Sequence, residues 1–199
     1  EREMTAYHET GHLIVTYLSH PRDDVFKASI IPRKSSLGVV HPTSIEEWHG
    51  RDRETLFADI KICLAGYAAE KIKFNTTTTG VTSDFKQAMK LAHFMVWVLG
   101  MGPSGMIGDY TVYKEGNALL LSEDVKMRLN QDVDKILKSC LVEVETLLRQ
   151  EKDLFERFAN ELLAKQELDY DEIEAVFAEY GKVNPRRSFL TQGTEPPKA

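Results

Sequence analysis

Residues 4–18 read MTAYHETGHLIVTYL, and this stretch decides the first element of the fold. Its apolar residues recur at helical spacing and Pro21 follows, so the sequence predicts a helix over 4–18. His8 and His12 lie four positions apart and therefore project from one face of that helix, with Glu9 beside them. Two histidines in this pattern are typical zinc ligands.

The same pattern predicts a reaction class. Zinc lowers the pKa of a water molecule to about 7, and Glu9 can remove its proton, so that the resulting hydroxide attacks a peptide carbonyl. The alternative is an accidental match in a metal-free helical interaction domain. The motif sits among apolar residues of an amphipathic helix, which favours zinc and peptide hydrolysis.

A catalytic zinc of this kind needs a third protein ligand. Asp84 is our choice, because it follows the loop Asn75–Gly80 at the start of a helix that we expect Ser83 to cap and to run to Leu99. Asp84 could also be an ordinary residue of a first helical turn. Glu70 is the rival: it could be a ligand, a partner that orients a histidine, or a solvated charge.

The remaining pattern predicts a mainly α-helical fold, with a small sheet or hairpin beside the first helix and a C-terminal helical bundle. The expected strands are 25–31 and 37–40, joined by a turn at 32–36 and stopped by Pro42. Residues 100–108 read as an irregular linker. Further helices are expected over these ranges, with Asp52, Ser122 and Asp169 as caps where a cap is evident: 52–73, 122–148, 154–163 and 169–177. We expect one domain over 1–180 and a flexible tail over 181–199.

Composition narrows the function further. The net charge is −6 with 28% charged residues, so we expect no nucleic-acid partner and no attraction to an anionic membrane surface. Two helical cysteines, Cys63 and Cys140, favour a reducing compartment. The apolar run Phe94–Leu99 is too short to span a bilayer. Because a helical pattern is already running near Glu1, we expect an excised domain of a longer protein.

A family resemblance extends over nearly all of residues 1–180. It is carried, in order, by these stretches: His8–His12, Ile30–Arg33, Leu37–Val39, Leu64–Glu70, Thr79–Gly80, Ser83–Asp84, Leu99–Gly102 and Leu163–Leu168. Their order and gaps closely resemble the peptidase domain of the FtsH-type AAA+ membrane-anchored metalloproteases. Such ordered agreement is more specific than the zinc motif alone.

The resemblance implies roles for the site residues. Asp84 would be the third zinc ligand, and Glu70 would support the site from behind the ligands. A substrate strand would add to the sheet edge at Gly38, Val39 and Val40, where backbone hydrogen bonds give affinity without demanding a sequence. Gly38 would then allow close approach of the substrate, although a turn or bulge is an equally good explanation of this glycine.

The resemblance also implies partners. Unfolded or damaged polypeptides would be the substrates, and the parent protein would be a homo- or hetero-hexamer in a cytoplasm-like compartment. ATP and membrane contacts would belong to upstream segments, because this chain carries no phosphate-binding glycine-lysine loop. We expect a ring to form through the helices of 122–177, although their apolar stripe could equally fill the domain's own core.

Three departures from the family pattern stand out. Thr10 replaces a common alanine, Ser83 replaces a common asparagine, and the threonine loop is shorter. A competing class is an inactive relative that persists as an assembly subunit. Such relatives lose zinc ligands or the base, whereas His8, Glu9, His12 and Asp84 are all present here, which favours an enzyme.

Overall fold

The computed structural model describes residues 1–32, 38–44, 50–115 and 118–186. The predicted turn, together with Leu37 and residues 187–199 of the predicted tail, therefore falls largely outside the described residues. Helices dominate the described part, as predicted. The elements are α1 (Arg2–Ser19), β1 (Asp23–Ser29), β2 (Val39–Ser44), α2 (Arg53–Phe74), the 3-10 turn η1 (Thr79–Val81), α3 (Thr82–Trp97), β3 (Lys114–Glu115), β4 (Ala118–Leu119), α4 (Glu123–Gln150), α5 (Lys152–Lys165), β5 (Glu167–Leu168) and α6 (Tyr170–Glu179).

Three predicted helix caps are confirmed. The Asp52 side chain accepts from Thr55 N, and Ser122 caps α4 in the same way. Asp169 and Glu172 form a reciprocal capping box at the start of α6. Each cap satisfies a backbone donor that would otherwise lack a partner, a contribution of about 1 kcal/mol.

The predicted cap of α3 is wrong. Ser83 lies inside the first turn, because α3 already begins at Thr82, directly after η1. Thr78 is the residue whose side chain caps this region, by accepting from Gly80 N. Because η1 already turns the chain, α3 needs no side-chain cap of its own at Val81. Asp84 nevertheless lies in the first turn of α3, as expected.

The sheet has the order β2-β1-β5, with antiparallel pairing throughout. Strand β2 runs through Pro42, which we expected to stop it. Pro42 pairs with Val25 next to a register shift in β1, and β2 is an edge strand. An edge strand tolerates proline, because one of its sides needs no ladder hydrogen bond. The two-residue strand β5 and the β3–β4 hairpin were not predicted.

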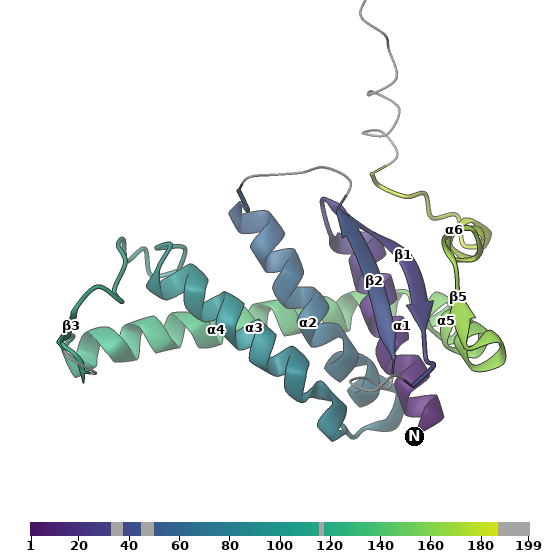
Figure 1. Ribbon diagram of the computed structural model, residues 1–199, viewed down its shortest axis with the longest axis horizontal. Helices are drawn as coiled ribbons and strands as arrows, with labels where there is room; N and C mark the ends of the chain where they lie inside the picture. The colour runs from purple at the N-terminus through teal and green to yellow at the C-terminus, as the bar shows by residue number, and fades with distance from the viewer. Residues whose placement is uncertain (33–37, 45–49, 116–117, 187–199) are drawn as a thin grey trace, which may run out of the picture.

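Two hydrophobic clusters form the core. One joins α1, the sheet, α5 and α6 with parts of α2 and α4, and the other joins α2, α3 and the first part of α4. Figure 1 shows α2 and α3 on one side of α1, α5 and α6 on the other, the strands β1 and β2 overlapping α1 in this view, and the long α4 running behind. Most of the α4 stripe is buried inside the chain, including these residues: Leu129, Val133, Ile136, Val144 and Leu148. The stripe therefore serves the chain's own core.

Two residues beyond 180 are also part of the packed structure. Asn184 and Arg186 are buried, and the Arg186 guanidinium donates to His20 O at 2.8 Å and to Asp24 Oδ1 at 2.9 Å. The expectation of a flexible segment from Gly181 onward does not hold for these two residues. Within the described part of the chain, the helices lack the combination of length and hydrophobicity that spanning a membrane requires.

Gly11 brings α1 against α2. A Cβ atom at this position would lie 2.6 Å from Ala65 O, so a larger residue would push the two helices apart. This close packing places the His8 and His12 face of α1 beside α2 and, through it, α3. The packing of α1 against α2 therefore holds the helix that carries the motif in place independently of a metal ion.

Candidate metal centre

Three side chains from two helices converge on one point. His8 and His12 lie one turn apart on α1, and their Nε2 atoms are 3.0 Å from each other. Asp84, in the first turn of α3, places Oδ2 at 3.2 Å from His8 Nε2 and 3.4 Å from His12 Nε2. Ligands of a tetrahedral zinc ion at 2.0–2.1 Å lie about 3.3 Å from one another. The three atoms therefore have the spacing of a zinc ligand set.

Hydrogen bonds to the far side of each imidazole fix which nitrogen is free. His8 Nδ1 lies 2.7 Å from Glu70 Oε1, and His12 Nδ1 lies 2.9 Å from Ile62 O. A carboxylate and a carbonyl can only accept, so both Nδ1 atoms carry hydrogen in the neutral rings. Both Nε2 lone pairs are then available at the point where Asp84 also arrives.

The structure separates the two candidates for the third ligand. Glu70 is 1% exposed and contacts His8 from the Nδ1 side, away from the converging Nε2 atoms. Asp84 Oδ2 is buried and accepts no hydrogen bond of acceptable geometry, although two Nε2 atoms lie near it. Such an acceptor among two imidazole lone pairs needs a cation, and the N, N, O donor set suits zinc.

The ionisation of the three groups reflects this concentration of charge. Burial lowers the pKa of His8, but the nearby Asp84 carboxylate, the charge of Glu9 and the contact with Glu70 raise it to about 9. For Asp84, burial raises the pKa, while the nearby imidazoles of His12 and His8 outweigh it and lower the pKa below its usual range. In the metal-free protein a proton therefore occupies the place that a cation would take.

Glu9 lies beside this point and is 7% exposed. Burial raises its pKa, His12 and His8 oppose the shift, and Asp84 adds to it. Gly38 passes directly over the carboxylate: a Cβ atom there would lie 2.6 Å from Glu9 Oε1. The structure thus brings together Glu9 and Gly38, the start of the predicted substrate-binding strand.

A cavity of about 820 Å³ opens over these residues. It extends along α1 in both directions from His8 and His12, and Val40 of β2 also lines it. The Val39 side chain lies outside the described residues. A further part of the lining comes from the threonine loop, at Thr78, Thr79 and Gly80. The cavity is large enough to admit several residues of an extended chain beside the candidate metal centre.

Sequence reasoning gave no role to Gly66, which the structure places against His8. A Cβ atom on Gly66 would lie 2.5 Å from His8 Nε2 and 2.6 Å from Nδ1, and closer still to Cε1. Gly66 sits in the interior of α2, where glycine costs about 1 kcal/mol relative to alanine. A glycine at this unfavourable helical position was the signal in the sequence that another group packs against its Cα atom.

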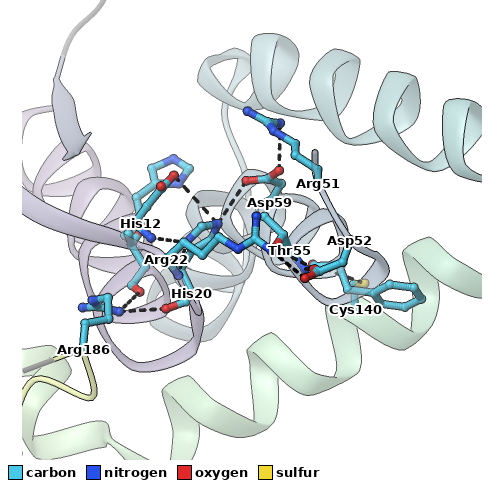
Figure 2. Close-up of polar contacts among 12 residues, drawn as sticks. His12, His20, Arg22, Arg51, Asp52, Thr55, Asp59, Cys140 and Arg186 are labelled. Atoms are coloured by element: carbon cyan, nitrogen blue, oxygen red, sulfur yellow. Dashed lines mark hydrogen bonds and ion pairs between the residues drawn. The ribbon is translucent and has the colours of Figure 1, made fainter. Parts of the chain in front are cut away.

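A second group, His20, Asp23 and Asp59, resembles the first in composition. His20 Nδ1, however, accepts from the backbone N–H groups of Arg22 at 3.2 Å and Asp23 at 2.5 Å. Nε2 therefore carries the hydrogen of the neutral ring and offers no lone pair to a metal. It lies 3.3 Å from Asp59 Oδ1, whose other oxygen pairs with Arg51 at 2.9 Å (Figure 2). The opposite tautomer and the nearby guanidinium exclude this group as a zinc site.

Comparisons with known proteins agree with this geometry. The model of Peptidase family M41 matches residues 1–176. The ATP-dependent zinc metalloprotease FtsH of Borreliella burgdorferi is 34% identical over 177 residues, which cover 85% of this chain and 28% of that protein. FtsH of Thermus thermophilus is 33% identical over 181 residues (88% and 29%), and FtsH 3 of Conexibacter woesei is 38% identical over 176 residues (85% and 23%).

The chain spans less than a third of the length of these relatives. The family match, in contrast, extends from the first residue of the chain into α6. The relatives are named as zinc metalloproteases, which agrees with the donor set at His8, His12 and Asp84. This chain therefore belongs to peptidase family M41.

Proposed function

We propose that His8, His12 and Asp84 hold the zinc ion and that Glu9 is the general base in hydrolysis of peptide bonds. One observation carries the proposal: two Nε2 atoms and one buried carboxylate oxygen meet within 3.0–3.4 Å, while both Nδ1 atoms face acceptors. A zinc ion bound there supplies a Lewis acid for attack on a peptide carbonyl.

Glu9 handles the proton. Its carboxylate takes a proton from the attacking water and returns it to the nitrogen of the leaving amine. Burial raises the pKa of Glu9, which strengthens the carboxylate as the base that takes the proton from water. Glu70 acts from behind the site, because its contact with His8 Nδ1 holds that ring in the tautomer that a metal requires.

The substrates we propose are unfolded or damaged polypeptides. β2 is an edge strand, so an extended chain can pair with its free side near Gly38, Val39 and Val40. Gly38 lies against Glu9, so a strand bound there would bring a peptide bond close to the base. Backbone pairing recognises an extended conformation and not a particular sequence, which suits substrates that have lost their fold.

We propose that this domain works within a larger machine. The named relatives are ATP-dependent and more than three times as long as this chain, so ATP use belongs to segments outside it. On the basis of the family relationship, we also propose that the larger protein forms a homo- or hetero-hexameric ring and has a membrane anchor outside this chain. We propose a reducing, cytoplasm-like compartment for this domain. Light scattering across a tenfold concentration range tests the ring: a constant monomer mass would contradict self-association of this domain.

Metal analysis and a cleavage assay test the site. The wild-type chain should contain about one zinc ion, and His8→Ala with His12→Ala should remove it. Glu9→Gln should keep zinc but lose at least ~10²-fold in cleavage of an unfolded casein-like substrate, because an amide cannot accept the proton. Cleavage by Glu9→Gln above about a tenth of the wild-type rate contradicts the base role. Zinc binding without cleavage by the wild type would instead indicate an assembly module.

A further inference from the structure

Glu70 contacts both segments that supply the proposed ligands, namely α1 and the loop that leads into α3. This carboxylate is 1% exposed, and its Oε1 atom contacts His8 Nδ1 at 2.7 Å on the α1 side. On the other side it accepts from Thr78: the backbone N–H donates to Oε2 at 2.6 Å, and the hydroxyl donates to Oε1 at 3.2 Å. A buried carboxylate depends on such donors, since leaving it unpaired is costly.

Thr78 also shapes the segment that carries Asp84. Its hydroxyl oxygen accepts from Gly80 N at 3.2 Å and so caps η1, which leads directly into α3. A hydroxyl has one donor and two acceptor sites, so it can serve Glu70 and Gly80 together. Thr78 and its neighbours at 75–80 are exposed, so packing contributes little to holding this segment. Val81, which is buried, is the next apolar anchor along the chain.

We infer that Thr78 is a positioning residue of the zinc site. It holds the segment that leads to Asp84 against the Glu70 carboxylate, which orients His8. The proposed ligands from α1 and α3 are thereby positioned relative to each other. The inference rests on the proposed ligand set. Among the described residues, Thr78 hydrogen-bonds to Glu70 and Gly80 and to none of the three proposed ligands.

The competing explanation is that Thr78 only caps η1. A cap stabilises the local backbone whether or not zinc is bound, and it does so independently of Glu70. A docking residue, in contrast, changes zinc affinity more than it changes the metal-free fold, and its effect disappears when Glu70 can no longer accept. These two consequences separate the explanations.

The experiment measures the zinc dissociation constant by competition with a chromophoric chelator, and the urea midpoint of the metal-free protein. Thr78→Val keeps the shape but loses the hydroxyl, and should weaken zinc binding by 10-fold or more, in the ~10- to 100-fold range of groups that support metal ligands. Thr78→Ser should restore binding to within about threefold, since the hydroxyl returns. Thr77→Val, an exposed neighbour of the same residue type, is the matched control and should bind as the wild type does.

A double-mutant cycle with Glu70→Ala completes the test. Alanine removes both acceptor oxygens of Glu70, so the contact with the Thr78 hydroxyl is already lost and Thr78→Val should then cost less than threefold more, a non-additive result. Wild-type zinc affinity in Thr78→Val, or full additivity in the cycle, overturns the inference. Absence of zinc from the wild-type protein would instead overturn the proposed function, so the two failures are distinguishable.

Discussion

Replacing Gly66 by alanine should weaken zinc binding without disrupting helix α2. The new Cβ atom would lie 2.5 Å from His8 Nε2 and 2.6 Å from Nδ1, whereas ordinary carbon contacts begin near about 3.4 Å. The ring must therefore move by roughly 1 Å. Metal–ligand distances tolerate only about 0.2 Å, so this displacement removes His8 from the ligand set.

The magnitude follows from what one ligand contributes. Four-ligand zinc sites bind with about 10–16 kcal/mol, or roughly 3 kcal/mol per ligand, which corresponds to more than about 100-fold in the dissociation constant. Alanine meanwhile favours the helix interior by up to about 1 kcal/mol. We therefore expect Gly66→Ala to lose zinc affinity by 100-fold or more while the metal-free protein stays folded, with a free energy of unfolding within about 1 kcal/mol of wild type.

Chelator competition and urea unfolding of the metal-free protein give the two quantities. Gly50→Ala is the matched control, because none of the described residues has an atom within 4 Å of the position that its Cβ would take, and its zinc affinity should not change. Wild-type zinc affinity in Gly66→Ala would refute the reasoning, since it would mean that His8 can leave its observed position without loss of the metal. Simultaneous loss of folding and zinc would show that Gly66 serves helix packing instead.

Three further outcomes are expected. Asp84→Ala should abolish zinc content and casein cleavage together, whereas Glu70→Gln should weaken zinc binding only ~10- to 100-fold; full zinc occupancy in Asp84→Ala would assign the ligand role elsewhere. Burial lowers the pKa of His8, but Asp84 and the other carboxylates raise it to about 9. Zinc must displace the proton that His8 then carries, so zinc should bind up to about tenfold more weakly per pH unit as the pH falls below 9. The sign is opposite for the metal-free protein, where the raised pKa adds stability that is full below 6.5 and is lost as the pH rises through about 9, a trend that urea midpoints can check. Arg186→Gln should destabilise the fold by about 3–5 kcal/mol in urea unfolding, because it leaves the buried Asp24 carboxylate without its charged partner, and a change below about 1 kcal/mol would contradict this.

Predictions that depend on neighbours in the sequence agreed with the structure. The caps at Asp52, Ser122 and Asp169 need only a side chain and the backbone three residues later. Two predictions failed for different reasons. Ser83 is not a cap because the 3-10 turn η1 directly precedes α3, a local feature that the helical pattern did not reveal. Pro42 is tolerated because β2 lies at the edge of the sheet, which depends on how distant strands pair.

The sequence by itself determined that His8 and His12 share a helix face with Glu9 beside them, since helical periodicity alone places residues four apart together. Only the tertiary structure shows where Asp84 and Glu70 lie relative to the two imidazole rings. The packing of α2 and α3 brings one carboxylate to the Nε2 side of the rings and the other to the Nδ1 side. It also set the tautomers of these two histidines, because Glu70 accepts at His8 and Ile62 O accepts at His12. Local periodicity can aim two side chains in one direction, but which groups meet them depends on contacts between segments 50 or more residues apart.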